Sequence, residues 1–422
     1  DAGIISGALL FIKKSFVLSS AEVGAIVAMV PVGALVSSAF SGKVSDIFGR
    51  KKTLFFTAVF FILGAFISAL TKDVAFLIIG RFIIGIAIGV GSCVSPVYTS
   101  ELADEKQRGW LVNLFVVSVQ LGVFLSFAIS YGLSHSGNWR EMIALGVIPA
   151  VVLGVGVFFL PESPRWLIGK CNKVDEGKKV LALINTQMTS TEIDEMSNSI
   201  AAGSSVSTNK TPFWSSRLKY PIVLAFLVAF FNQLSGINAI LYFSPRIFEM
   251  TGLGQEAALL QSAGIGITNL LATFVGLWLI DRLGRRTLLY IGSVGYILAL
   301  GACSWAFANE VYAIVPYCIF LFIAAHAVGQ GAVIWVFIAE IFPTEHRTTG
   351  QSLGCSTHWV FAALLTLFFP MAASAFPPSY LFGFFCFMMV LQLIWVFIMV
   401  PETKGVSLEA LSEKLSRKNK TD

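Results

Sequence analysis

Charged side chains are scarce in this sequence. Asp, Glu, Lys and Arg together make up 13% of its 422 residues, whereas 56% of the residues are hydrophobic. Apolar stretches long enough to cross about 30 Å of hydrocarbon recur along the whole chain. The short alternating segments typical of a membrane β-barrel are absent from the sequence. The composition therefore excludes a soluble globular protein and indicates an all-α, polytopic membrane protein.

The sequence also lacks the usual groupings of catalytic and metal-binding residues. It has only four His, and the spacing of its six Cys fits neither a metal site nor a disulfide framework. No nucleophile is paired with a base, and no phosphate-binding glycine loop follows a strand. We therefore expect no enzymatic activity, no ATP coupling, no metal and no cofactor. The net charge of +5 resides in connecting loops and requires no nucleic-acid partner.

Twelve membrane spans are predicted from the apolar stretches. They lie at residues 1–14, 21–42, 53–71, 74–98, 110–132, 141–160, 218–250, 257–280, 286–308, 311–341, 350–372 and 379–400. The chain begins at Asp1 inside an apolar segment, so we expect about half of the first span to be missing.

One long polar link interrupts the spans, and it predicts the domain organisation. Residues 161–217 include helix-like stretches near Asp175–Ile184 and Thr191–Ile200. We therefore predict an N-terminal six-helix bundle, a cytoplasmic helical linker domain, a C-terminal six-helix bundle and a cytoplasmic tail, at residues 1–160, 161–217, 218–400 and 401–422. A tail helix is expected at Ser407–Leu415, where three Leu form one apolar stripe.

Lys and Arg residues gather in alternate loops. The loops after the second, fourth, sixth, eighth and tenth spans, with the tail, hold most of them. Cytoplasmic loops carry such an excess of positive charge, so the linker and both termini are predicted to be cytoplasmic.

Three motifs occur twice, six spans apart. The repeated motifs are Asp46-Ile-Phe-Gly49-Arg50 with Asp281-Arg-Leu-Gly284-Arg285, Glu101 and Arg108 with Glu340 and Arg347, and Pro161-Glu162-Ser163 with Pro401-Glu402-Thr403. Three correspondences at one offset indicate an internal duplication. Two related bundles are typical of a transporter that works by alternating access.

The seventh span carries an unusual concentration of amides. Asn232, Gln233 and Asn238 lie around Gly236 within an apolar stretch. Amides supply donors and acceptors together, which suits an uncharged ligand rich in hydroxyl groups. Such groups are costly in hydrocarbon unless they face protein or a water-filled cavity. Hydrogen bonding between neighbouring helices alone is the alternative explanation.

Two ionised residues are predicted within the hydrocarbon zone, Asp1 in the first span and Arg81 in the fourth. Each would be costly alone, so we expect them to pair. An Asp that loses its Arg partner in a dry site binds a proton more readily, and the pair could therefore act as a proton switch. A static bridge between two helices is the alternative.

Taken together, these motifs resemble the sugar porter family of the major facilitator superfamily. Further motifs of the resemblance are Gly80-Arg81-Phe82, Pro161-Glu-Ser-Pro-Arg165-Trp166, Gln233-Leu-Ser-Gly-Ile-Asn238, Glu340-Ile-Phe-Pro343 and Pro401-Glu-Thr-Lys-Gly405. The resemblance implies the major facilitator fold. It also implies that an acid at the position of Asp1 accompanies proton coupling.

The resemblance further implies where a monosaccharide would bind. The implied substrate-binding residues are Asn232, Gln233, Asn238, Asn269, Trp335, His358 and Trp359. The sequence departs from the family pattern at Val116, where a sugar-binding Gln is usual, and at Ala332, where a Pro is usual. Gln120 lies one turn beyond Val116 on the same helical face, so we add Gln120 to the predicted site.

Charged residues at the cytoplasmic helix ends form a predicted gate. Its members are Arg50, Glu101, Arg108, Arg285, Glu340 and Arg347. Each half supplies both signs of charge, so the ends can associate when the carrier faces outward and separate when it opens inward. Positive-inside topology alone would not explain Glu101 and Glu340 at matching positions.

These observations predict a secondary transporter that moves a monosaccharide by proton symport, as a monomer in the bacterial inner (plasma) membrane. Its partners are then the sugar, the proton and the lipid bilayer. The alternatives are a passive uniporter in which Asp1 is structural, and a carrier or sensor of another polyol such as inositol. A sugar receptor is disfavoured because few residues follow Pro401.

Overall fold

The computed structural model describes residues 2–103, 108–185, 188–205, 212–343 and 346–404. For residues 108–110, 112–113, 202–205 and 347–348 the backbone alone is described. This part of the chain is helical and contains no strand. The predicted all-α class is therefore confirmed.

The helices fall into three groups along the chain. The N-terminal half comprises α1 (Ala2–Ser15), α2 (Ser20–Phe48), α3 (Arg50–Leu70), α4 (Val74–Leu102), α5 (Arg108–Gly132), α6 (Trp139–Leu145) and α7 (Val147–Phe159). The linker carries α8 (Pro164–Gly169), α9 (Val174–Ile184) and α10 (Ser190–Ser205). The C-terminal half comprises η1 (Ser216–Leu218), α11 (Lys219–Leu234), α12 (Ile237–Glu249), α13 (Gln255–Leu283), α14 (Arg285–Ala308), η2 (Tyr312–Ile314), α15 (Val315–Val328), α16 (Gln330–Ile341), α17 (Arg347–Ala375) and α18 (Pro378–Ile398).

Eleven helical segments in the described residues are long and apolar enough to cross a membrane. They coincide with the second to twelfth predicted spans, and α1 occupies the place of the first. Several helices continue past the predicted ends, because a helix need not stop where its apolar residues stop. Thus α2 continues to Phe48 and α13 to Leu283, and each is followed by a glycine, Gly49 or Gly284, whose φ of 88° suits glycine.

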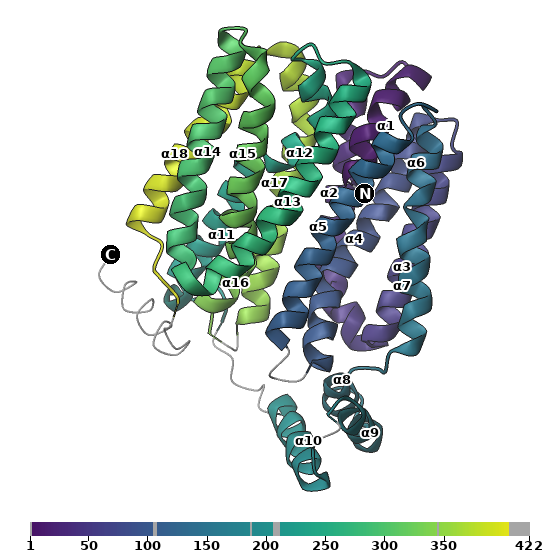
Figure 1. The fold of residues 1–422 in the computed structure, drawn as a ribbon. Coiled ribbons are helices and arrows are strands. Elements are labelled where there is room, and N and C mark those ends of the chain that lie inside the picture. The colour runs from purple at the N-terminus through teal and green to yellow at the C-terminus, as the bar shows by residue number, and fades with distance from the viewer. Residues whose placement is uncertain (1, 104–107, 186–187, 206–211, 344–345, 405–422) are drawn as a thin grey trace.

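The linker forms the two helices that its sequence predicts and one more. α9 and α10 cover the stretches near Asp175–Ile184 and Thr191–Ile200. The additional helix α8 begins at Pro164, and the preceding Ser163 accepts a hydrogen bond from the backbone N–H of Trp166 at 3.2 Å. A hydroxyl cap followed by proline is a common way to start a helix. Figure 1 shows these three helices at one end of the bundle.

The two halves lie side by side and meet along α2 with α17 and α5 with α13 (Figure 1). Small residues permit the close approach. A Cβ on Gly24 would lie 2.2 Å from the carbonyl oxygen of Leu367, and a Cβ on Gly266 would lie 2.8 Å from the Cα of Phe124. A polar contact also joins the halves at the end of α1, where Lys14 Nζ donates to the side-chain oxygen of Gln255, the first residue of α13, at 2.7 Å.

Three predicted spans are broken by a short irregular turn. α6 and α7 meet at Gly146, α11 and α12 at Gly236, and α15 and α16 at Gly329. Gly236 has a φ of 87°, and Gly329 has a φ of −87° and a ψ of −99°. Breaks inside a membrane protein leave backbone groups without helical partners, and they are tolerated where protein or a water-filled cavity surrounds them. The last two breaks lie beside the predicted substrate residues.

Candidate functional site

Gln233, at the end of α11, is the centre of a buried amide cluster. Its Nε2 donates to Asn232 Oδ1 at 2.9 Å, and its Oε1 accepts from Asn238 Nδ2 at 2.7 Å. The break at Gly236 allows this contact, since it brings the first turn of α12 back over the last turn of α11. The structure therefore brings together the three amides that the sequence predicted.

An aromatic group from two other helices adjoins this cluster. Gln233 Nε2 lies 3.0 Å from Nδ1 of His358 on α17. The His358 ring lies 5.4 Å from the ring of Trp335 on α16 and 5.1 Å from that of Trp359. Amides beside indole rings can hydrogen-bond hydroxyl groups while the ring faces pack on C–H groups.

A second pair of amides joins the two halves. Asn269 Nδ2 on α13 donates to Gln120 Oε1 on α5 at 2.7 Å. Asn269 is 3% exposed, and its Oδ1 has no hydrogen-bond partner among the described residues. A buried acceptor without a partner is costly, so this oxygen is suited to receive a hydroxyl group.

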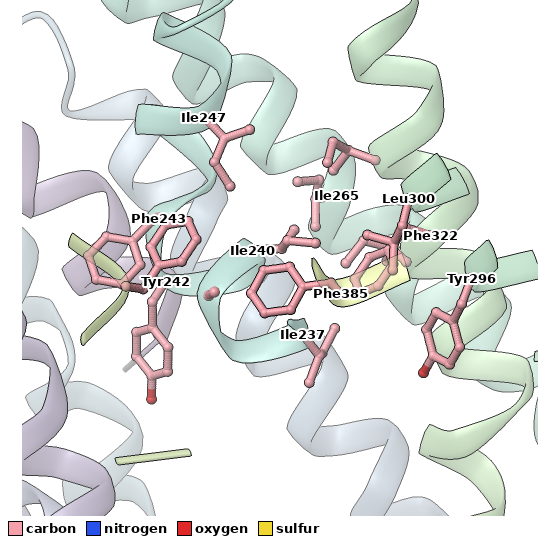
Figure 2. Packing of buried hydrophobic residues seen from close by; sticks show 14 of the residues in the cluster. Ile237, Ile240, Tyr242, Phe243, Ile247, Ile265, Tyr296, Leu300, Phe322 and Phe385 are labelled. Atoms are coloured by element: carbon pink, nitrogen blue, oxygen red, sulfur yellow. The ribbon is translucent and has the colours of Figure 1, made fainter. Parts of the chain in front are cut away.

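Apolar side chains surround the turn between α11 and α12 on its far side. Figure 2 shows Ile237, Ile240 and Phe385 packed around this turn. A Cβ added to Gly236 would lie 2.7 Å from Cδ2 of Phe385. The turn is therefore held in a packed cluster, and only glycine suits both its conformation and its space.

Two polar contacts at the other break are absent from the sequence prediction. Tyr296 Oη on α14 lies 2.6 Å from Nδ1 of His326 on α15. Gln330 is the first residue of α16, and its Nε2 donates to Gln392 Oε1 at 2.9 Å. Polar residues inside apolar spans are the only signal that could have indicated them. The break lies at Gly329 even though Ala332 stands where the family commonly has Pro.

The structure describes only one member of the predicted ion pair, Arg81. Arg81 is 1% exposed, and its Nε donates to the carbonyl oxygen of Ile26 at 3.2 Å. Asp1 lies outside the described residues. The pairing of Asp1 with Arg81 therefore stays a prediction.

Ion pairs at the corners where α2 meets α3 and α13 meets α14 have the same geometry in both halves. Arg50 binds Glu101 through Nε at 2.9 Å and Nη2 at 3.1 Å. Arg285 binds Glu340 through the same atoms at 3.1 and 2.8 Å. Paired bonds of this kind fix geometry as well as charge. Each described pair lies within one half.

The repeated Pro-Glu motifs complete these corners. Glu162 Oε1 accepts from the backbone N–H of Arg50 at 3.1 Å, and Glu402 Oε1 accepts from that of Arg285 at 3.0 Å. Carboxylates are favoured at the N-terminus of a helix, which is where α3 and α14 begin. Arg108 and Arg347 are the first residues of α5 and α17, and their side chains lie outside the described residues.

The family described as Sugar (and other) transporter matches residues 1–415. The glucose transporter GlcP of Staphylococcus epidermidis is 35% identical over 419 residues, which cover 98% of this chain and 93% of that protein. The galactose-proton symporter of Escherichia coli is 32% identical over 434 residues, covering 100% and 92%. This chain belongs to the sugar transporter family. It is a multi-pass membrane transporter and not an enzyme.

Solved structures of a related protein share the fold. The inward open conformation of the xylose transporter XylE from E. coli has a TM-score of 0.85 with 26% identity, covering 98% of this chain and 95% of that one. XylE bound to 6-bromo-6-deoxy-D-glucose has a TM-score of 0.80 with 27% identity and the same coverage. The major facilitator fold implied by the resemblance is therefore confirmed. The present conformation is more similar to the inward open structure than to the ligand-bound one.

Proposed function

We propose that this protein carries a monosaccharide across the membrane by alternating access, coupled to protons. The amide cluster around Gln233 is the observation that supports this function most strongly. It combines several donors and acceptors with the indole ring of Trp335, close to where α13 of one half meets α5 of the other. A hydroxyl-rich, uncharged ring is the ligand that such a lining fits.

Within this proposal the sugar contacts come mainly from the C-terminal half. Asn232, Gln233 and Asn238 bind hydroxyl groups from one side, and Asn269 binds one through its unpartnered Oδ1. Trp335, His358 and Trp359 pack on the ring, and Gln120 is the contribution of the N-terminal half. The names of the relatives include glucose, galactose and xylose transporters, so hexoses and pentoses are the first substrates to test.

Proton coupling is assigned to Asp1 and Arg81. The Arg81 guanidinium is buried, and an anionic partner would offset the cost of burying this charge. Protonation of Asp1 would then weaken the attachment of α1 to α4 and link proton binding to the conformational change. The names of two relatives, an arabinose-proton and a galactose-proton symporter, support this assignment over a passive uniporter.

The remaining assignments follow from the charge pattern and the fold. We infer that the protein is a monomer in the inner membrane. Its two helical bundles comprise residues 1–160 and 218–400. The linker between them (residues 161–217) and the tail (residues 401–422) are cytoplasmic. The ion pairs of Arg50 with Glu101 and of Arg285 with Glu340 stiffen the cytoplasmic corners of each half. Arg108 and Arg347 complete the proposed gate between the halves.

Uptake into proteoliposomes tests the proposal. Labelled hexoses, pentoses and inositol are offered to the wild type and to Asp1→Asn, with and without an inward proton gradient. We expect gradient-dependent accumulation of at least one monosaccharide by the wild type. The Asp1→Asn variant should lose accumulation but still exchange the same sugar.

Equal, non-concentrative uptake by both proteins under both conditions would establish a uniporter and make Asp1 structural. Uptake of inositol alone would make the protein a polyol carrier. Binding of a sugar without any uptake would contradict a transport function.

A further inference from the structure

The break between α15 and α16 has no proline to enforce it. The sequence contains no proline between Pro316 and Pro343. Gly329 and Gly331 weaken a helix, but glycine does not forbid one. Gly329 nevertheless has a φ of −87° and a ψ of −99°, which is far from helical values. Contacts with other helices must therefore hold this break.

The first such contact is a close approach of two glycines. A Cβ on Gly329 would lie 2.7 Å from the Cα of Gly292 on α14, and a Cβ on Gly292 would lie 3.0 Å from the Cα of Gly329. The backbone at the break therefore packs directly on α14. Packing of this kind permits the break, but it is not directional and does not fix the direction in which α16 continues.

The second contact is a buried chain of three polar side chains. Gln330, the first residue of α16, donates through Nε2 to Oε1 of Gln392 on α18 at 2.9 Å. Gln392 Nε2 donates to the hydroxyl of Ser293 on α14 at 2.8 Å, and that hydroxyl donates to the carbonyl oxygen of Leu289 at 2.7 Å. All three side chains belong to residues that are 0% exposed. The chain therefore fixes the start of α16 relative to α14 and α18, which lie side by side in Figure 1.

The amide pair supplies direction at a cost in stability. Oε1 of Gln330 has no hydrogen-bond partner among the described residues. A buried acceptor without a partner destabilises the fold, whereas apolar side chains of the same shape would avoid that penalty. Hydrogen bonds constrain angles as well as distances. The pair of Gln330 and Gln392 therefore serves the orientation of α16 better than it serves stability.

The orientation of α16 determines the position of Trp335. This residue lies five positions beyond Gln330 on the same uninterrupted helix. Its ring lies 5.4 Å from that of His358, and its carbonyl oxygen accepts from Gln351 Nε2 at 2.8 Å. A change in the direction of the first turn of α16 would therefore move the indole ring relative to His358.

We propose that Gln392 is a positioning residue for the substrate site. Through Gln330 it holds the α15–α16 break and so fixes where the indole ring of Trp335 meets the ligand. α18 carries none of the residues predicted to bind sugar, so the role of Gln392 is indirect. A site aligned in advance loses less conformational entropy on binding. This inference rests on the proposed function, because its effect is measured on sugar binding.

The test measures the dissociation constant of the transported sugar by equilibrium dialysis, together with the melting temperature, on the purified transporter. Gln330→Met with Gln392→Met replaces both amides by unbranched apolar side chains, and Ser293 keeps its bond to Leu289. The melting temperature should stay within about 2 °C of the wild type, because neither amide is left without its partner. The dissociation constant should rise about fivefold, because the direction of α16 is no longer fixed before binding.

A second double variant tests whether the amide pair acts by enforcing the break. Gln330→Pro with Gln392→Met also lacks both amides. Proline is favoured at the first position of a helix, and its ring excludes a continuous helix through the preceding turn. The dissociation constant should therefore return to within about twofold of the wild type.

Ser304→Ala is the matched control for a lost contact between α14 and α18. The hydroxyl of Ser304 on α14 donates to the carbonyl oxygen of Ser379 on α18 at 2.7 Å. This substitution removes a hydrogen bond between the same two helices without touching Gln330 or Gln392. It should leave the dissociation constant unchanged.

Three outcomes would overturn the inference. One is a dissociation constant for the methionine pair within about twofold of the wild type, which would leave the amides a structural role only. Another is equal weakening in the methionine pair and the proline variant, since the break would then not be what the amides supply. The third is equal weakening in Ser304→Ala. The methionine pair decides the question even if the proline variant does not fold. If the wild type binds no sugar, the proposed function itself is wrong and the inference is wrong with it.

Discussion

The two halves of the chain have matching corners, where α2 meets α3 and α13 meets α14, but different centres. At each corner an Arg is bound by a Glu on a neighbouring helix, and the Glu of a Pro-Glu motif accepts from the Arg backbone N–H. The glycines at these corners have φ and ψ values that agree within 5°. The repeated sequence motifs therefore correspond to repeated three-dimensional structure.

The centres of the halves differ in their helix breaks and polar groups. In the C-terminal half, α11–α12 and α15–α16 are broken beside Gln233 and Trp335. In the N-terminal half, the spans at the matching positions are α1 and α4; α1 is continuous over Ala2–Ser15, and α4 runs unbroken through Pro96. The comparison indicates that the corner serves the same purpose in both halves, whereas the residues proposed to bind the ligand are concentrated in one of them.

Joining the halves covalently should have the largest effect. The side chains of Cys93 on α4 and Cys355 on α17 lie close enough to interact with each other. Oxidation by copper phenanthroline should link them, and uptake should fall roughly 20-fold because the halves can no longer move apart. Dithiothreitol should restore uptake.

The control for this experiment is Cys355→Ser, which cannot form the bond and should be unaffected by the oxidant. Full uptake after complete cross-linking would mean that transport needs no separation of α4 from α17.

Gly236→Ala should be the most damaging single substitution in the broken helices. Alanine is strained at a φ of 87°, by about 1–3 kcal/mol, and its Cβ would lie 2.7 Å from Phe385. We expect uptake to fall about tenfold as the amide cluster loses its geometry. Gly156→Ala in α7 is the matched control, because nothing lies within 4 Å of its Cβ position. Equal effects of the two would show that the turn does not matter.

Arg50→Gln and Arg285→Gln should have smaller effects, similar to each other. Each removes the partner of a half-buried carboxylate, at a cost on the order of 2 kcal/mol to the conformation that contains the pair. Uptake should fall roughly fivefold in both variants, because the balance between inward and outward states shifts. The charge exchange Arg50→Glu with Glu101→Arg should recover part of the loss. A large loss at only one corner would contradict their equivalence.

Substitution of the Asp three residues before each corner glycine, Asp46 or Asp281, should have the smallest effect of these variants. The two halves should nevertheless differ clearly in how far the melting temperature falls. Asp46 is 40% exposed and contacts Arg50 at 3.0 Å and Lys170 at 2.9 Å, whereas Asp281 is 81% exposed and lies 3.4 Å from Arg285. Asp46→Asn should lower the melting temperature by about 1–2 °C and Asp281→Asn by less than about 0.5 °C. The difference should shrink in high salt. A larger loss for Asp281→Asn would reverse this ranking.

Much of the fold could be predicted from sequence because its signals are local. Long apolar stretches mark the spans, and charged motifs at a constant offset mark the duplication. The same applies to the amides of α11 and α12, because they lie within one turn of each other across the break. His358 and Asn269 could be assigned only through resemblance, since they come from helices distant in sequence.

The remaining features depend on tertiary contacts. Nothing in the local sequence indicates that Tyr296 meets His326, or that Gln392 meets Gln330. The break at Gly329 was not predictable from proline, because Ala332 replaces it. For Asp1 and the tail helix at Ser407–Leu415 the expectations stay untested, because both lie outside the described residues.

The most direct test of the account compares Gln233→Ala with Gln120→Ala in their affinity for the transported sugar. Both are amides of the candidate site, one from each half. Gln233→Ala should raise the dissociation constant about 10- to 100-fold, because it removes the hydrogen bonds that organise Asn232, Asn238 and His358. Gln120→Ala should raise it less than about fivefold, because Asn269 keeps its other groups. An equal or larger effect of Gln120→Ala would contradict a substrate site centred on the C-terminal half.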